Sequence, residues 1–295
     1  MKYKNPRALE MAVKAAARAS GTDTSKAIAG FYFDRFLCRV FSEDDPAFIL
    51  KGGQSMLART PAARSTRDID LLSQSLDIEE AVEELKRIAS IDLGDFMTYA
   101  FARVAKIKET DEYRSGYKVY FHSSLGLTRK SDISIDLVAD QVTCEKAIKQ
   151  SPASRLIVGD LQTYNYLLYP IENAIADKVC AIAELHDGRE SSRVKDLVDL
   201  AVVFTTQEVD AKDMRRQVEL EARLRKLAPI SGFSIPASWI SLRQGQYAKL
   251  ARETSLPAEL QKLEPATEFI ANRLNTAIAG KEDGKRWNPV EQLWK

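Results

Sequence analysis

The sequence predicts a mixed α/β (α+β) fold, with a sheet-containing half over residues 1–169 and a helical half over residues 170–295. Short apolar runs and period-two alternation of polar and apolar residues, which are typical of strands, occur up to Tyr169. From Ile171 onward, apolar residues recur at the three-to-four-residue spacing of amphipathic helices. A chain of 295 residues, 45% of them hydrophobic, is long enough for one large domain or two smaller ones.

Helical patterns open the chain and dominate its second half. Asn5–Ala19 and Ser25–Phe41 carry apolar stripes at helical spacing, and Asp77–Ala89 has acidic residues in its first turn, where they favour a helix. Further helices are predicted over Ile171–Leu185, Arg193–Phe204, Ala211–Leu227, Ser238–Arg252, Pro257–Lys262 and Pro265–Ala279. In the polar tail, we expect Trp287 and Trp294 to dock on the body of the protein.

Strands are predicted where β-branched and aromatic residues cluster or alternate with polar ones. The apolar run Phe48–Leu50 is followed by Gly52-Gly53, and a helix over Ser55–Arg59 would complete a strand–turn–helix unit. Other strands are predicted at Asp68–Leu72, Phe96–Lys108, Tyr117–Phe121 and Asp132–Val138, with short strands or loops over Arg155–Tyr169.

The composition excludes several classes of protein. No run of about 18 apolar residues is present, so no membrane span is predicted. The three cysteines are scattered without disulfide or zinc spacing, which fits a reducing, cytoplasmic location. Only two histidines are present, which argues against a metal site or catalytic triad built on histidine.

The net charge of +1 neither demands nor excludes a nucleic-acid partner, so the distribution of charge matters more. Arg59, Arg64 and Arg67 lie beside Asp68 and Asp70 in the sequence, where a basic patch would attract a polyanionic substrate. A second basic cluster comprises Arg215, Arg216, Arg223, Arg225 and Lys226. That cluster is equally consistent with a solvated helix face, because glutamates are interleaved with it.

Asp68 and Asp70 are the central candidates for chemistry. On a strand they point to one face, while Ile69 points to the other. Two adjacent carboxylates repel each other unless a cation lies between them, and carboxylate oxygens are ligands that Mg²⁺ prefers. The upstream Gly52-Gly53 allows a close approach of the backbone to phosphate oxygens. Alone, an Asp-x-Asp pair is more often a surface turn than a metal site.

Asp136 is predicted to complete this carboxylate set. It lies between Ile135 and Leu137 in a period-two strand, and Asp132 and Asp140, which share its parity, are the alternatives. Three such carboxylates fit two-metal phosphoryl or nucleotidyl transfer, in which one aspartate also takes the proton from the attacking hydroxyl.

Downstream, a lysine and two aspartates are further candidates. Lys178 lies on the apolar side of a predicted helix, where it either extends its ammonium to solvent or binds nucleotide phosphates. Arg193, Asp196 and Asp199 have the spacing of ordinary i, i+3 ion pairs as well as that of a site. Ser55 either binds phosphate or caps a helix.

Taken together, these motifs resemble the AbiEii (MenT-type) nucleotidyltransferase toxins of the wider DNA polymerase β-like superfamily. The resemblance rests on Gly52-Gly53-x-Ser55, Thr66-x-Asp68-x-Asp70, Asp136, Asp177-Lys178 and Arg193-x-x-Asp196-x-x-Asp199. It spans about Phe48 to Phe204. Family members often have Gly-Ser where this chain has Gly53-Gln54-Ser55, which leaves open which side chain meets the phosphates.

The resemblance implies a two-lobed protein, with a polymerase β-like nucleotidyltransferase N-terminal lobe and a helical C-terminal lobe around a basic cleft. It implies Asp68, Asp70 and Asp136 as Mg²⁺ ligands, and adds Lys178 and Asp196 to the catalytic set. It leaves open whether Asp196 or Asp199 is the functional aspartate. The implied nucleotide-binding residues are Lys51, Gly52, Gly53, Ser55, Thr66, Arg193 and Asp199.

The function implied by the resemblance is that of a toxin neutralised by a cognate antitoxin. Such a toxin would transfer a nucleotide from a nucleoside triphosphate to RNA, at the 3′ acceptor end of tRNA, and so block translation. Two alternatives remain open. The same chemistry could modify a small molecule, or the protein could be a nucleotide-binding module without catalysis.

Overall fold

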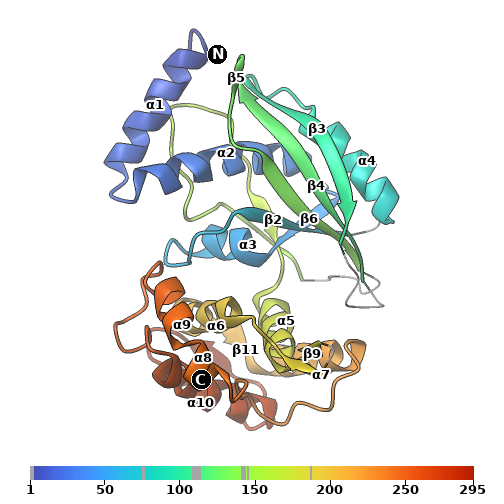
Figure 1. The fold of residues 1–295 in the computed structure, drawn as a ribbon, viewed down its shortest axis with the longest axis vertical. Helices are drawn as coiled ribbons and strands as arrows, with labels where there is room; N and C mark the ends of the chain where they lie inside the picture. Colours follow the sequence, from blue (N-terminus) through green and yellow to red (C-terminus); the bar gives the residue numbers. More distant parts are fainter. Residues whose placement is uncertain (1–2, 75–76, 108–113, 141–143, 145, 187) are drawn as a thin grey trace. The chain divides into compact units, whose positions relative to one another are not determined.

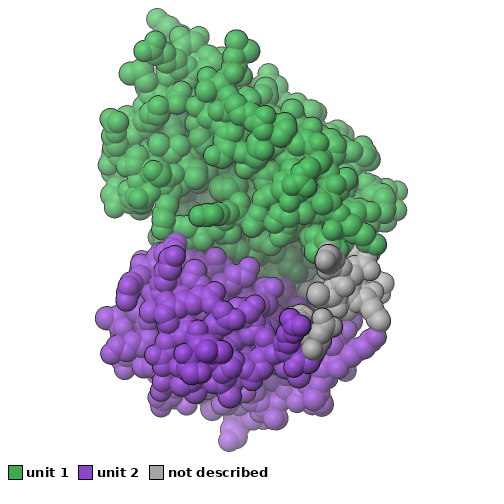
Figure 2. Space-filling model, in the orientation of Figure 1, with its two compact units in different colours: residues 1–61, 65–169 green, residues 62–64, 170–295 purple. Residues whose placement is uncertain are grey.

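The computed structural model describes residues 3–74, 77–107, 114–140, 144, 146–186 and 188–295 (Figure 1). The chain divides into two compact units, coloured separately in Figure 2. Unit 1 comprises Met1–Pro61 and Ser65–Tyr169, and unit 2 comprises Ala62–Arg64 and Pro170–Lys295. The three residues 62–64 therefore belong to unit 2, although the chain before and after them belongs to unit 1.

Unit 1 is built on a mixed sheet (Figure 1), to which the described residues contribute eight strands. The strands are β1 (Phe48–Lys51), β2 (Asp68–Ser73), β3 (Met97–Lys106), β4 (Arg114–Leu125), β5 (Thr128–Arg129), β6 (Ile133–Asp140), β7 (Ile148–Gln150) and β8 (Tyr166–Leu168). Their order is β3-β4-β6-β2-β1-β8-β7, and β5 pairs with β4. Strand β6 lies between β4 and β2, antiparallel to β4 and parallel to β2.

The helices of unit 1 in the described residues are α1 (Pro6–Ala19), α2 (Thr24–Val40), α3 (Gly52–Arg59) and α4 (Ile78–Ala89). Side chains cap three of them. Asn5 accepts a hydrogen bond from the Ala8 amide, Asp23 from that of Lys26, and Asp77 from that of Glu80. Each cap satisfies a backbone donor that the first helical turn leaves without a partner.

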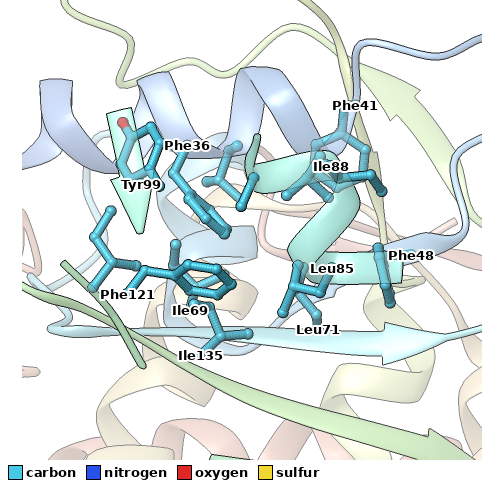
Figure 3. Close-up of a cluster of buried hydrophobic side chains, with 14 of the residues drawn as sticks. Phe36, Phe41, Phe48, Ile69, Leu71, Leu85, Ile88, Tyr99, Phe121 and Ile135 are labelled. Carbon is cyan, nitrogen blue, oxygen red and sulfur yellow. The ribbon is translucent and has the colours of Figure 1, made fainter. Parts of the chain in front are cut away.

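The core of unit 1 lies between the sheet and helices α2 and α4 (Figure 3). Phe36 of α2 packs against Phe121 of β4, and Leu85 of α4 belongs to the same buried cluster. Ile69 and Ile135 point into this cluster from β2 and β6. Because side chains alternate along a strand, the neighbours of Ile69 and Ile135 lie on the opposite face of the sheet.

A buried ion cluster holds α2 to the residues that precede β3. Asp95 is fully buried and accepts hydrogen bonds from Arg35 and from both terminal nitrogens of Arg39. Burial would raise the pKa of the Asp95 carboxyl, but the bonds and charges of Arg39 and Arg35 hold that pKa below its ordinary value. The cluster therefore stabilises unit 1 as long as Asp95 is ionised.

Unit 2 is mainly helical. Its helices are α5 (Ile171–Ala183), α6 (Val194–Thr206), α7 (Ala211–Leu224), α8 (Trp239–Leu242), α9 (Gln244–Ala251) and α10 (Leu263–Ile278). Helix α6 is buried over most of its length and contacts α5, α9 and α10, as expected for a helix that is apolar nearly all round. Short strands β9 (Leu185–His186) and β10 (Arg189–Glu190) form a hairpin.

The C-terminal tail forms strands β12 (Arg286–Asn288) and β13 (Leu293–Trp294), which make a small sheet with β11 (Val209–Asp210), the strand between α6 and α7. Trp287 is 2% exposed, donates a hydrogen bond to the Phe204 carbonyl, and packs edge-on against Phe204 and Trp294. The expected docking of the tail tryptophans is thus confirmed for Trp287. Among the described residues, no helix combines the length and apolar composition needed to cross a bilayer.

Several sequence predictions need correction. The helix after β1 begins at Gly52 instead of Ser55, so the glycines form its first turn. The predicted helix Ser238–Arg252 divides into α8 and α9 at Arg243, and Pro257–Lys262 forms turns. The second half is not all helical, because its tail pairs as strands. The last residue of the predicted strand Phe96–Lys108 lies outside the described residues.

The second basic cluster takes part in local ion pairs. Arg215 pairs with Glu219 and Asp283, and Arg225 pairs with Glu221 and Glu184. The Arg215 contacts are surface pairs, as a solvated helix face predicts, whereas Arg225, with 8% of its side chain exposed, pairs with buried glutamates.

Candidate functional site

A row of four charged residues crosses the sheet of unit 1. The register places Lys51 of β1 beside Asp70 of β2, Asp70 beside Asp136 of β6, and Asp136 beside Lys118 of β4. Residues in register share a face of the sheet, here the face opposite to the Ile69 and Ile135 side chains. The two aspartates therefore lie side by side, with a lysine on each outer strand.

The next row carries the third predicted carboxylate. Asp68 lies beside Ser134, Ser134 beside Tyr120, and Tyr120 beside Arg103 of β3. The Ser134 hydroxyl donates a hydrogen bond to Asp68 Oδ1, and the Arg103 guanidinium lies 3.6 Å from the centroid of the Tyr120 ring. The carboxylate site thus has polar, aromatic and cationic neighbours on its own face of the sheet.

Lys118 connects the two rows. Its Nζ lies 3.2 Å from Asp68 Oδ1 and 3.0 Å from Asp136 Oδ1. Partial burial alone would lower the pKa of Lys118, but its contacts with Asp136 and Asp68 raise that pKa above the ordinary value. Within the described residues, the buried Asp136 Oδ1 accepts no well-aligned hydrogen bond, so the Lys118 charge is its chief compensation.

The glycine turn brings the start of α3 to Asp70. Gly52 has φ of +61°, and a Cβ atom at this position would lie 1.9 Å from Asp70 Oδ2. A Cβ on Gly53 would lie 2.8 Å from Thr66 Cβ. Both positions thus require glycine, the first by conformation and the second by space. In the described part of the chain, no side chain caps α3, so its first-turn amides and positive dipole end suit an anion.

The carboxylates fit a divalent cation by chemistry and by position. Asp68, Asp70 and Asp136 offer oxygen ligands on one face, and the Asp136 oxygen without an aligned donor is suited to a cation. No group of three or more Asp, Glu, His or Cys side chains in the described ranges is drawn together as a metal would draw it. Asp132, one alternative to Asp136, instead pairs with Arg129 and His122, and the other, Asp140, ends β6.

The other predicted residues of unit 1 lie near this face in different settings. The Lys51 ammonium lies 4.1 Å from the centroid of the Tyr169 ring, and Ser55 is buried in α3. The Thr66 hydroxyl donates to the Asp68 carbonyl at 3.4 Å. Three arginines were expected to guide a polyanion. Arg59 donates to the Tyr169 carbonyl, and Arg59 and Arg64 are both partly buried, so only Arg67 of the three is exposed.

Unit 2 holds a second cluster, which comprises Lys178, Asp196, Asp199, Arg193 and Arg64. The Lys178 ammonium lies 3.2 Å from Asp196 Oδ1 and 2.7 Å from Asp199 Oδ2. Arg193, at the start of α6, pairs with Asp196. Arg64 forms a bidentate salt bridge with Asp199, with its Nε 2.9 Å from Oδ1 and a terminal nitrogen 3.1 Å from Oδ2. The predicted lysine and both aspartates of unit 2 therefore form one network, and Arg64 joins it.

Burial and charge act in opposite directions in this network. Burial would lower the pKa of Lys178, but the charges of Asp199 and Asp196 raise it. Burial would likewise raise the pKa of Asp196, but Lys178 and Arg193 lower it. Lys178 and Asp196 thus stabilise each other's charged form, and the Arg193 side chain, 47% exposed, is the most accessible member of the network.

Two functional candidates were missed by sequence reasoning. Lys118 and Ser134 were passed over because the pairing of β4 with β6, and of β6 with β2, cannot be read from separate strand patterns. The alternation of polar and apolar residues could have found them. Lys118 alternates with the apolar Val119, and Ser134 alternates with Ile135, just as Asp136 does.

Comparison with known proteins identifies the family. The model of the family described as "Nucleotidyl transferase AbiEii toxin, Type IV TA system" matches residues 35–282. No curated protein sequence matches the chain.

Three solved structures illustrate the alignments that the chain gives. MenT4, a nucleotidyltransferase toxin from Mycobacterium tuberculosis H37Rv, aligns over 92% of this chain and 88% of its own, with a TM-score of 0.52 and 12% identity. A candidate nucleotidyltransferase from H. pylori aligns over 86% of this chain and 98% of its own, with a TM-score of 0.47 and 14% identity. JHP933 from Helicobacter pylori aligns over 88% and 96%, with a TM-score of 0.44 and 14% identity.

The match to MenT4 confirms the predicted fold class, a polymerase β-like nucleotidyltransferase fold, and at this identity it bears on the fold alone. The family model covers most of the chain, including the glycine turn, the three aspartates and the Lys178 cluster. The chain therefore belongs to the AbiEii family of nucleotidyltransferase toxins of type IV toxin–antitoxin systems.

Proposed function

We propose that this protein transfers a nucleotide from a nucleoside triphosphate to the 3′ acceptor end of tRNA in a Mg²⁺-dependent reaction, and so blocks translation in the cytoplasm. One observation carries the proposal. Asp70 and Asp136 lie side by side on the sheet, with Asp68 in the adjoining row and the glycine turn of α3 against Asp70. A cognate antitoxin is the partner that the family implies.

In this proposal Asp68, Asp70 and Asp136 hold the metal ion. When bound, Mg²⁺ would neutralise charge on the triphosphate and on the attacking and leaving oxygens. Asp136 would also take the proton from the attacking hydroxyl. Ser134 fixes the orientation of the Asp68 carboxylate through its hydrogen bond.

The triphosphate would bind at the start of α3. The amides of Gly52 and Gly53 lie in the first turn of the helix, where they suit phosphate oxygens. Thr66 packs on Gly53, and Lys51 ends the strand that leads into the turn, so both are placed beside this position. Ser55, one turn further on, is buried and supports the turn in this proposal.

In unit 2 we propose that Lys178 and Asp196 serve the reaction through the network they form. Lys178 is held by two carboxylates, and Asp196 orients Arg193, whose exposed guanidinium would bind phosphate. Asp199 joins Lys178 to Arg64 and would set the position of both. In this proposal Asp196 acts through Arg193, and Asp199 acts through Arg64.

The neighbours of the carboxylates favour RNA over a small-molecule acceptor. Lys118, 30% exposed, flanks the aspartate row, and the next row ends in Tyr120 with Arg103 over its ring. Cations bind the phosphate backbone, and an aromatic ring beside a guanidinium is typical of surfaces that hold unpaired bases. An acceptor without phosphates would gain little from these groups.

The test is label transfer from each of the four nucleoside triphosphates, offered separately with Mg²⁺, to total tRNA. We expect label at the 3′ end of tRNA with at least one nucleotide. We expect a loss of about 10²-fold or more with Asp70→Asn, because a metal ligand is removed. Asp132→Asn is the matched control, since Asp132 is exposed and pairs with Arg129.

Four outcomes would contradict the proposal or one of its residue assignments. Absence of label in tRNA with every nucleotide would exclude this substrate, and transfer to a small hydroxyl compound alone would favour the other acceptor class. Tight triphosphate binding without any transfer would indicate a binding module. A loss of activity in Asp132→Asn with full activity in Asp136→Asn would move the third carboxylate to Asp132.

A further inference from the structure

Lys118 is a cation built into the carboxylate site. It comes from β4, two strands away from Asp68 and Asp70, and its ammonium contacts one oxygen of Asp68 and one of Asp136. Both contacts are between side chains that are about one-third exposed, so the lysine can leave the site without unfolding the sheet. Its position is set by register, because Lys118 is the direct neighbour of Asp136.

A divalent cation needs the space that this ammonium fills. Magnesium binds carboxylate oxygens at about 2.0–2.1 Å. An ion held by Asp68 Oδ1 and Asp136 Oδ1 would lie between the same two oxygens as Lys118 Nζ, and two cations cannot share this position. Binding of the metal through these two aspartates therefore requires the lysine to move.

We propose that Lys118 competes with the divalent cation for Asp68 and Asp136 and, once displaced, binds the triphosphate, so that the metal binds well only together with the nucleotide. This inference rests on the proposed function for its metal ligands. It adds a residue and an order of binding that the carboxylates alone do not imply.

The physical reason is the difference in charge between a metal ion alone and a metal–triphosphate complex. A metal ion alone must replace both ion pairs of Lys118 and leaves the ammonium without an acceptor. A metal–triphosphate complex brings phosphate oxygens to the same face, and the displaced ammonium exchanges carboxylate for phosphate. Lys118 thus opposes binding of the metal alone and favours binding of the metal–nucleotide complex.

The experiment measures binding, not transfer. Full-length protein freed of metal with EDTA is titrated with Mn²⁺ and followed by electron paramagnetic resonance, without nucleotide and without RNA. The protein variants are the wild type, Lys118→Met and Lys118→Arg. We expect Lys118→Met to bind Mn²⁺ about tenfold more tightly than the wild type, and Lys118→Arg to bind like the wild type.

The second titration uses each of the four nucleoside triphosphates in turn at saturating Mn²⁺. Here we expect the opposite change for any nucleotide that the wild type binds, namely about tenfold weaker binding by Lys118→Met. The matched control is Lys106→Met, which removes the same charge from an exposed position paired with Tyr117, on the other face of the sheet. Lys106→Met should leave both affinities within about twofold of the wild type.

A measurement on the wild type alone covers the case in which Lys118→Met fails to fold. Amine acetylation of Lys118, read by mass spectrometry, should accelerate when Mn²⁺ is added, because the ammonium is released from its carboxylates. The acetylation rate of Lys106 should not change. An unchanged Lys118 rate at saturating Mn²⁺ would overturn the inference.

The outcomes separate this inference from the proposed function. Equal Mn²⁺ binding by the wild type and Lys118→Met would overturn the competition and leave the carboxylate site intact. Absence of Mn²⁺ binding by every variant, with and without nucleotide, would overturn both. Opposite shifts for metal and nucleotide support the inference even where tRNA proves not to be the acceptor.

Discussion

Replacing Gly52 by alanine tests the geometry on which the proposed metal site depends. Gly52 has φ of +61°, and the added Cβ would lie 1.9 Å from Asp70 Oδ2. This is far inside van der Waals contact, so Asp70 or the turn must move. The substitution adds one methyl group and no charge, which makes the consequence steric.

The cost has two parts. An L-residue in the left-handed region costs about 1–2 kcal/mol. Forcing the Asp70 side chain away from its preferred rotamer adds about 0.5–1.5 kcal/mol. The reduced freedom of the unfolded chain returns about 0.4–1 kcal/mol. We therefore expect Gly52→Ala to lower the free energy of unfolding by about 2 kcal/mol.

Urea denaturation measures this change, and the transfer assay measures its functional effect. Displacement of a metal ligand by about 1 Å is expected to reduce nucleotidyl transfer by about 10²-fold. Gly30→Ala is the matched control, because Gly30 lies within α2 and an added Cβ meets nothing within 4 Å. It should raise stability by about 0.5–1 kcal/mol and leave activity unchanged.

Two results would refute this reasoning. Equal stability of Gly52→Ala and Gly30→Ala would mean that the turn adapts without strain. Full transfer activity in Gly52→Ala, whatever its stability, would mean that the position of Asp70 against the glycine turn is unimportant for the reaction.

Three further predictions concern stability. Lys178→Met should lower the free energy of unfolding in urea by about 3–5 kcal/mol, because it leaves buried carboxylates without their shared cation; a loss below about 1 kcal/mol would contradict this. Trp287→Ala should cost about 3–5 kcal/mol by calorimetry, since it removes a buried ring that contacts Phe204, and an unchanged Tm would show that the tail is dispensable. The folded-state pKa of Asp95 is below its ordinary value of 3.8, so its contribution to the free energy of unfolding is complete above pH 3.8 and is lost as the pH falls through the folded value. Acid titration followed by circular dichroism should show stability falling steeply below about pH 4. Stability that stays constant down to about pH 2 would contradict this prediction.

The local elements of the fold could be predicted because periodicity and caps are local signals. Helices α1, α4 and α5 begin within one residue of the predicted positions, where Pro6, Asp77 and Pro170 mark the starts. The start of α3 was predicted too late, because glycine was taken as a break in the chain. The positive φ of Gly52 is compatible with a helix start, because the Asp70 carboxylate occupies the space that a side chain at position 52 would need.

The candidate site was accessible only in part, because its residues come from strands that are distant in sequence. Asp68 and Asp70 share a face by parity alone, so their relation follows from the sequence. Their relation to Asp136 depends on the parallel register of β2 and β6, which no local pattern specifies. The contact of Lys118 with Asp136 depends on the further pairing of β4 with β6, and the sequence alone did not predict that pairing.

Strand order has a consequence for a protein whose activity harms the cell that makes it. Asp70 is synthesised early, but its neighbour Asp136 arrives only on β6, the strand inserted between β4 and β2. A nascent or truncated chain that ends before β6 has neither the third carboxylate nor the strand that supports β4 beside β2. Because long-range parallel pairing forms slowly, the complete carboxylate row is a late product of folding. Fragments ending before β6 should therefore be harmless, because their carboxylate site is incomplete.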